Sequence, residues 1–427
     1  MRTFSNQDPA LAVALVVRGE EYFSEVRGLR SVSEGDLLTK NTVFPVNHFD
    51  RPLIAYAILQ LVDEGKLKLN QEVEDILPKF PKFQHAIRVE DLLRQKSGLR
   101  DMYTLHCMKF GFENKPTTRE QQLKMLYAQT ELNFEPGRDS DDFFYGEVVL
   151  QEVIKEVSGK PFDEYMREMV FLPIGMKDAC YLPRKQRLDH QAVYYSWGAS
   201  GLEEDTPWEE YPWTPYLSIS DCSQWAQHMT KAGAKGPSWW QRLISYGIPN
   251  DNYSAGILSF QVQNYGKDVM SIELSGLSDE GRRSGAAPTL AKVFFEDEVW
   301  FEEALEGDVR LGGRYGGRGA KGRQVLGPEY FKNLPGIYES PELDLRLEIK
   351  VEEEVLWVHF LGLDPVPLVG SRDSSSILEC GHPGSETHRS TPMFKTLSLG
   401  AGEGQISEIR LSRFGVKNLL FRRVETD

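Results

Sequence analysis

Residues 47–67 read NHFDRPLIAYAILQLVDEGKL, and this stretch decides the fold. Its apolar side chains recur at helical spacing, which predicts a helix from Asn47 to Gly65. Gly65 is well placed as a helix stop, and Pro52 falls in the first turn, where its missing N–H does no harm. The apolar positions of the repeat are Phe49, Leu53, Ile54, Ala57, Ile58, Leu61 and Val62.

Alternating strands and further helical segments surround this helix in the sequence. Strands are predicted at 11–17 and 21–29, joined by a tight turn at Arg18-Gly19, and paired strands at 255–273. Residues 207–216 are rich in proline and aromatic side chains and predict an ordered loop. The predicted helices are 88–95, 146–158 with the stop signature Ser158-Gly159-Lys160-Pro161, 164–180 ending in a turn, and 221–232 capped by Asp221.

The chain changes character near residue 307. The stretch 307–327, GDVRLGGRYGGRGAKGRQVLG, is rich in Gly and Arg and indicates a linker or long loop. Short alternating strands separated by turn residues follow, which is typical of a small β-sandwich or barrel. The predicted organisation is an α/β (α+β) domain at 1–305, a Gly/Arg-rich linker or loop at 306–327 and an all-β C-terminal domain at 328–427.

Composition narrows the classes of partner. The chain has 427 residues and a formal net charge of −15, which argues against nucleic acid and anionic membranes as partners. No stretch approaches the roughly 20 apolar residues that span a bilayer, and Leu11–Val17 predicts a strand rather than a signal peptide. The four cysteines lie far apart with no CxxC, which suits a reducing compartment and predicts a cytoplasmic location. The eight histidines are scattered, so neither a metal nor another cofactor is predicted.

Several segments resemble one family, in its order and at near-family spacing. They are Ala57–Leu67 with Val73–Pro78, Val89–Leu93 with Lys96–Leu99, Phe134–Gly137, Glu156–Phe162 and Pro173–Asp178. The chain thereby resembles the serine β-lactamase and penicillin-binding-protein-like hydrolases, which include class C β-lactamases, DD-peptidases, carboxylesterases and acyltransferases. The resemblance is good from about residue 10 to 235. It implies a β-lactamase/transpeptidase-like domain with an antiparallel sheet and a helical subdomain, and residues 328–427 resemble the small β-barrel of some members.

The same resemblance implies three catalytic motifs, and this sequence departs from each. Ser-x-x-Lys, whose hydroxyl attacks a carbonyl while the lysine takes its proton, falls on His48-Phe49-Asp50-Arg51. Arginine stays protonated in proteins and cannot act as that base. Tyr-x-Asn falls on Asp142-Phe143-Phe144, with Tyr145 one residue beyond. Lys-Thr-Gly or His-x-Gly falls on Glu273-Leu274-Ser275-Gly276.

These replacements predict a cleft that runs acid–base chemistry without a serine nucleophile. The expected substrate is an apolar, oxygen-rich small molecule, and the expected reaction is an isomerisation, cyclisation or elimination of the kind that biosynthetic pathways use. His48 is a natural proton carrier near neutral pH, and Arg51 could hold an anionic oxygen. The predicted catalytic residues are His48, Asp50, Arg51, Asp142 and Tyr145. The predicted substrate-binding residues are Phe49, Phe143, Phe144, Trp208, Trp213, Tyr216, Glu273 and Ser275.

Three alternatives stay open at this point. In a purely structural interpretation Asp50 caps the helix, Arg51 pairs with Asp142, and His48 is a satisfied, half-buried side chain. The chain could then be a pseudo-hydrolase that binds a ligand or a partner without turnover. It could also be a hydrolase or acyltransferase with another nucleophile, for which Ser97 and Ser275 are the candidates.

Overall fold

This computed structural model describes most of the chain with its side chains. The described residues are 8–46, 50–110, 118–139, 145–182, 188–198, 201–205, 214–231, 239, 242–243, 253–254, 260–264, 269–275, 332–352, 355–360, 365–370, 377–380, 396–399, 406–413 and 416–424. The predicted linker at 306–327 lies outside them. Tertiary contacts divide the chain into two compact units, one of 1–77, 88–94 and 146–313 and one of 78–87, 95–145 and 314–427.

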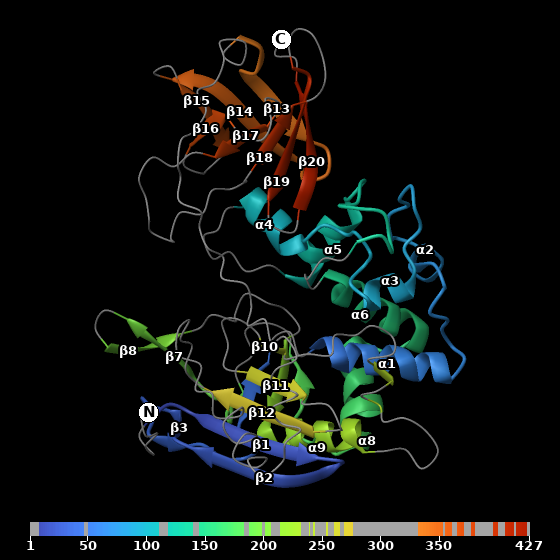
Figure 1. The fold of residues 1–427 in the computed structure, drawn as a ribbon, viewed down its shortest axis with the longest axis vertical. Coiled ribbons are helices and arrows are strands. Elements are labelled where there is room, and N and C mark those ends of the chain that lie inside the picture. The colour runs from blue at the N-terminus through green and yellow to red at the C-terminus, as the bar shows by residue number, and fades with distance from the viewer. Residues whose placement is uncertain are drawn as a thin grey trace, which may run out of the picture. The chain divides into compact units, whose positions relative to one another are not determined.

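The first unit contains a five-stranded antiparallel sheet, in the order β10-β11-β12-β1-β2 (Figure 1). The β1–β2 hairpin turns at Arg18 and Gly19, whose φ angles of 49° and 83° are the left-handed values that a two-residue hairpin turn needs. The sheet confirms the predicted pairing of the N-terminal hairpin with strands near 255–273. Its members are β1 (Leu11–Val17), β2 (Glu20–Arg27), β10 (Tyr253–Ser254), β11 (Phe260–Asn264) and β12 (Val269–Ser275).

Helix α9 (Ile219–Thr230) packs across β1, β2 and β12. Its cap is Ser218, whose hydroxyl accepts a hydrogen bond from the Asp221 N–H, while the Asp221 carboxylate accepts one from the Ser218 N–H. The prediction that Asp221 caps a helix at 221–232 was therefore wrong by one helical turn. Both residue types cap helices well, and the reciprocal capping box places the serine outside and the aspartate inside.

Helix α1 (Asp50–Asp63) is the predicted helix, and it is buried on almost every side. Such a helix belongs to the core rather than to the surface, because no face is left for water. It ends at Asp63, and the predicted stop Gly65 follows with a φ of 69° and donates its N–H to the Val62 carbonyl. Residues 47–49 of the prediction lie outside the described part of the chain.

Short elements complete the first unit. Residues 164–180, predicted as helix and turn, contain a π-helical turn, and the helical segments end at Ile174. The last two residues of the predicted loop at 207–216 are strand, because β9 pairs with β5 and β6. The remaining helices are α2 (Val73–Ile76), α3 (Val89–Leu93), α6 (Tyr145–Ser158), α7 (Phe162–Tyr165), η1 (Met166–Phe171) and α8 (Leu172–Ile174). The remaining strands are β3 (Leu29–Ser31), β4 (Asp36–Leu37), β5 (Val43–Pro45), β6 (Cys180–Tyr181), β7 (Tyr194–Gly198), β8 (Gly201–Asp205) and β9 (Pro215–Ser218).

The second unit is a closed antiparallel barrel with two helices against it. Leu105 and Met108 of α4 (Met102–Phe110) and Met125 of α5 (Arg119–Tyr127) belong to the same hydrophobic cluster as the barrel interior. The unit that holds the barrel thus also includes helices from the middle of the sequence, and a free-standing domain at 328–427 stays a prediction. The strands are β13 (Gly336–Ser340), β14 (Leu345–Glu352), β15 (Val355–Phe360), β16 (Val366–Gly370), β17 (Ile377–Cys380), β18 (Thr396–Leu399), β19 (Glu408–Arg413) and β20 (Val416–Arg423).

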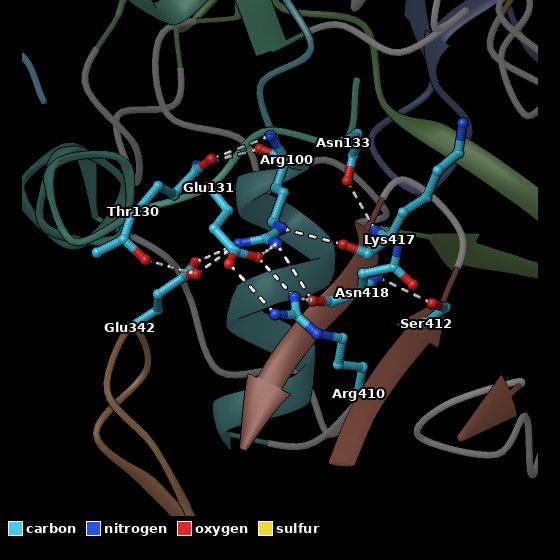
Figure 2. A network of polar contacts seen from close by, with 10 residues as sticks. Arg100, Thr130, Glu131, Asn133, Glu342, Arg410, Ser412, Lys417 and Asn418 are labelled. Atoms are coloured by element: carbon cyan, nitrogen blue, oxygen red, sulfur yellow. Dashed lines mark hydrogen bonds and ion pairs between the residues drawn. The ribbon is translucent and has the colours of Figure 1, made fainter. Parts of the chain in front are cut away.

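A fully buried arginine ties these helices to the barrel (Figure 2). Arg100 Nη1 donates to both carboxylate oxygens of Glu342 at 2.5 and 2.6 Å. Its Nε donates to the Lys417 carbonyl at 3.2 Å, and its Nη2 donates to Glu131 and to the Asn418 carbonyl, both at 3.3 Å. Every nitrogen of the guanidinium group therefore has a partner, which is what a buried charge requires.

We predict that Arg100→Met lowers the free energy of unfolding by about 3–5 kcal/mol, because Glu342 would keep a buried charge without its cation. Arg422→Met is a matched control. Arg422 pairs with Glu408 on the surface of the same barrel, and exposed pairs contribute about 0–1 kcal/mol. Urea unfolding measures both variants. Equally small losses would contradict a role for Arg100 in holding the barrel to the helices.

Candidate functional site

The described part of the Ser-x-x-Lys position is the first turn of α1. Asp50 is the first residue of the helix and is half-buried. The backbone N–H groups of Asp50 and Arg51 act on its carboxylate and favour the ionised form. A carboxylate at this place is favoured because the first N–H groups of a helix have no partner within the helix.

Arg51 is buried with only 5% of its surface exposed, and it joins three helices. Its Nη2 donates to the carbonyl of Leu93 at the end of α3, over 3.1 Å. Its Nε lies 3.9 Å from Oε1 of Glu147, in the first turn of α6. Among the described residues this carboxylate is therefore the counter-ion of the guanidinium group.

Sequence reasoning missed Glu147, although a signal was present. Leu150, Val153 and Ile154 are buried and mark the core-facing side of α6. Glu147 and Gln151 fall on that same side by helical spacing, and both are only 3% exposed. Two polar residues on the apolar side of a helix are the pattern that points to a buried polar site.

Burial changes the acid strength of both carboxyl groups. It raises the pKa of Glu147 from 4.5 to about 7; the negative charge of Asp50 adds to this shift and Arg51 opposes it. Burial also raises the pKa of Asp50, from 3.8 to about 6, against the backbone N–H groups and Arg51. The two groups titrate as a pair, and one guanidinium cannot neutralise two buried carboxylates. Near neutral pH the pair can therefore both accept and release a proton.

A tyrosine hydroxyl completes the cluster. Tyr181 of β6 is buried, and its ring stacks on Phe171 at a centroid distance of 5.9 Å and meets the edge of Phe162 at 4.8 Å. Burial, and after it the charge of Asp50, raises the pKa of the Tyr181 hydroxyl well above its ordinary value. The hydroxyl thus stays protonated and is available as a hydrogen-bond donor.

The comparisons with known proteins agree with this architecture. The model of the β-lactamase family matches residues 3–251. The chain belongs to the β-lactamase family. This finding confirms the resemblance that the sequence carries.

Two curated relatives and two solved structures illustrate which proteins this β-lactamase-family chain is similar to. The putative penicillin-binding protein PbpX of Bacillus subtilis (strain 168) is 30% identical over 198 residues, which are 46% of this chain and 47% of PbpX. Esterase EstB of Burkholderia gladioli is 27% identical over 185 residues, 40% of this chain and 47% of EstB. The chain thus spans about half the length of these relatives.

The solved structures share the fold at low identity. The octameric penicillin-binding protein homologue from Pyrococcus abyssi has a TM-score of 0.53 at 17% identity, over 97% of this chain and 96% of its own. The D-amino acid amidase from Ochrobactrum anthropi SV3 has a TM-score of 0.52 at 17% identity, over 67% of this chain and 94% of its own. The predicted fold class is therefore confirmed.

The structure describes some of the predicted site residues and leaves others outside the described part of the chain. Tyr145 begins α6, and Tyr216 is a half-buried residue of β9. Glu273 and Ser275 are buried in β12, which is flanked by β1 and β11, so they lie in the middle of the sheet. The predictions for His48, Phe49, Asp142, Phe143, Phe144, Trp208 and Trp213 fall outside the described residues.

The described residues contain no group of three or more His, Cys, Asp or Glu side chains that could hold a metal ion. No described helix is long and apolar enough to cross a membrane.

We predict that Glu147→Gln flattens the dependence of stability on pH. A carboxyl group whose pKa is higher in the folded state stabilises the fold at low pH, and this contribution is lost as pH rises from about 4.5 to 7. The free energy of unfolding of the unmodified protein should therefore fall relative to the variant across this window, by at most roughly 1.4 kcal/mol per pH unit.

Urea unfolding at several pH values tests this expectation. Glu156→Gln, at an exposed position of the same helix, is the control and should follow the unmodified protein. Parallel curves for all three proteins would show that Glu147 titrates alike in the folded and unfolded chains.

Proposed function

We propose that this chain hydrolyses small esters or amides with water as the nucleophile and Asp50 as the general base. The observation that carries the proposal is the half-buried Asp50 at the start of α1, with its pKa raised to about 6. A general base acts best when its pKa lies near the working pH. Asp50 is also the more exposed of the two carboxyl groups, so it is the one that a substrate can approach.

One residue, Asp50, can carry out every proton transfer that this reaction requires. The Asp50 carboxylate takes a proton from water while the water oxygen forms a bond to the carbonyl carbon. The bond to the leaving alcohol or amine then breaks, and Asp50 returns the proton to that group. No covalent enzyme intermediate forms, which suits a chain with histidine and arginine at the Ser-x-x-Lys position.

The neighbours of Asp50 support this role. Arg51 contacts the Leu93 carbonyl and Glu147, so we assign it to balancing the charge of the carboxyl pair rather than to holding an oxyanion. Tyr181 is buried, and the negative charge of Asp50 helps to keep its hydroxyl neutral by raising the pKa further.

The names of the relatives favour hydrolysis over the isomerase, cyclase or lyase reactions predicted from the sequence. They include an esterase, an amidase, and a hydrolase with promiscuous acyltransferase activity. None of these three proteins is named for an isomerisation or an elimination. A pseudo-hydrolase remains the alternative, and a chain that turns over no ester or amide would favour it.

We predict that Asp50→Asn lowers kcat/KM for a p-nitrophenyl ester or a D-amino acid amide by about 10²–10⁴-fold, the usual contribution of a general base. In the unmodified enzyme kcat/KM should rise with pH through an apparent pKa near 6, because the base must be ionised. Glu64→Gln, at the exposed far end of α1, is the control and should keep full activity. Undiminished turnover in Asp50→Asn would remove Asp50 from the chemistry.

We further predict that a fluorophosphonate or a β-lactam leaves no stoichiometric adduct on the intact protein, because the nucleophile position holds His48. Intact-protein mass spectrometry measures this directly. A class C β-lactamase treated in parallel serves as the positive control. A mass increase mapped to a serine such as Ser97 would favour the alternative of a different nucleophile.

A further inference from the structure

Three buried polar atoms on α1 and α6 make no hydrogen bond. Among the described residues, Arg51 Nε, Glu147 Oε2 and Gln151 Oε1 have no hydrogen bond. Their residues are 5%, 3% and 3% exposed, so bulk water does not satisfy them. Buried polar atoms in proteins are hydrogen-bonded in the great majority of cases, so these three need an explanation.

The geometry places the three side chains next to one another. Glu147 and Gln151 are four residues apart on α6, which sets their Cβ atoms roughly 5–6 Å apart on the same side of the helix. Arg51 faces Glu147 from α1, with 3.9 Å between Nε and Oε1. That distance exceeds the roughly 2.7–3.2 Å of a direct N–H···O bond, so the pair leaves its hydrogen-bonding capacity unused.

The donor and acceptor types match a single small molecule. The Nε–H of arginine is a donor, whereas the carboxylate and amide oxygens are acceptors. One water molecule can accept from the arginine and donate to both oxygens, which satisfies all three atoms at once. We infer that a buried water molecule joins Arg51, Glu147 and Gln151, and that Gln151 is a positioning residue for the carboxyl pair.

The consequence for the site is electrostatic. A hydrogen bond from this water favours the ionised form of Glu147. The other charged groups that act on Glu147 are Asp50 and Arg51 of α1, while α3 contributes the Leu93 carbonyl that Arg51 holds. Gln151 thereby influences how the pair shares its proton. Only the effect of this proton sharing on catalytic turnover rests on the proposed function.

A crystal structure that resolves ordered waters tests the inference directly. Density within hydrogen-bonding distance of all three atoms is expected in the unmodified protein and should be lost in Gln151→Met, which keeps the length of the side chain without its amide. A Gln151 amide turned so that Nε2 donates straight to Glu147, or an Arg51–Glu147 pair in direct contact with no density between them, would overturn the inference.

Infrared titration provides a readout that needs no substrate. The C=O band of protonated Glu147, assigned by its loss in Glu147→Gln, should shift its midpoint upward by roughly one pH unit in Gln151→Met. Glu156→Gln should leave the midpoint unchanged. An unmoved midpoint in Gln151→Met overturns the positioning role even if Asp50 proves to be the base. A moved midpoint supports that role even if the protein hydrolyses nothing.

Discussion

The core of the first unit depends on enclosing the charged start of α1. This helix is buried along nearly its whole length, so Arg51 cannot reach bulk water and must find its partners inside the fold. The effective penalty for burying a charge is several kcal/mol, which the attraction of Glu147 offsets only with additional hydrogen bonds. The end of α3 and the first turn of α6 are therefore tied to the first turn of α1.

The protein contains a second buried arginine, and the two differ in a way that separates structure from function. Arg100 has partners for every nitrogen and two oxygens of one carboxylate within 2.6 Å. Arg51 has one backbone acceptor and a carboxylate at 3.9 Å. A fully satisfied pair holds elements together and leaves no group free to react. The Arg51–Glu147 pair lacks such hydrogen bonds and also feels the charge of the Asp50 carboxyl group, and the proposed acid–base role rests on this difference.

The sequence predicted the elements that depend on local patterns and missed the contacts that depend on tertiary structure. Helix α1 and strand β1 could be predicted because apolar periodicity and turn residues are local signals. The position of α9 was wrong by one turn, because Ser218 and Asp221 are both good caps and only their reciprocal bonds distinguish them. Glu147 was missed because its partner is 96 positions away in the sequence. The packing of α4 and α5 on the barrel lacks a sequence signal for the same reason.

In the proposed reaction the family fold works without a serine nucleophile, because different residues determine the fold and the chemistry. Apolar burial of α1 keeps the helix in place, whereas the family's acyl transfer depends on the few side chains at its start. Once serine and lysine are replaced, the position still has the features that suited it to catalysis: a helix N-terminus, a partly exposed first residue and a buried charge behind it. A carboxylate in that first position is favoured in its ionised form by the helix N–H groups. Its burial holds the pKa near neutrality. In the proposed reaction Asp50 is therefore the group that acts on water, whereas Glu147, with 3% of its surface exposed, acts only through its charge.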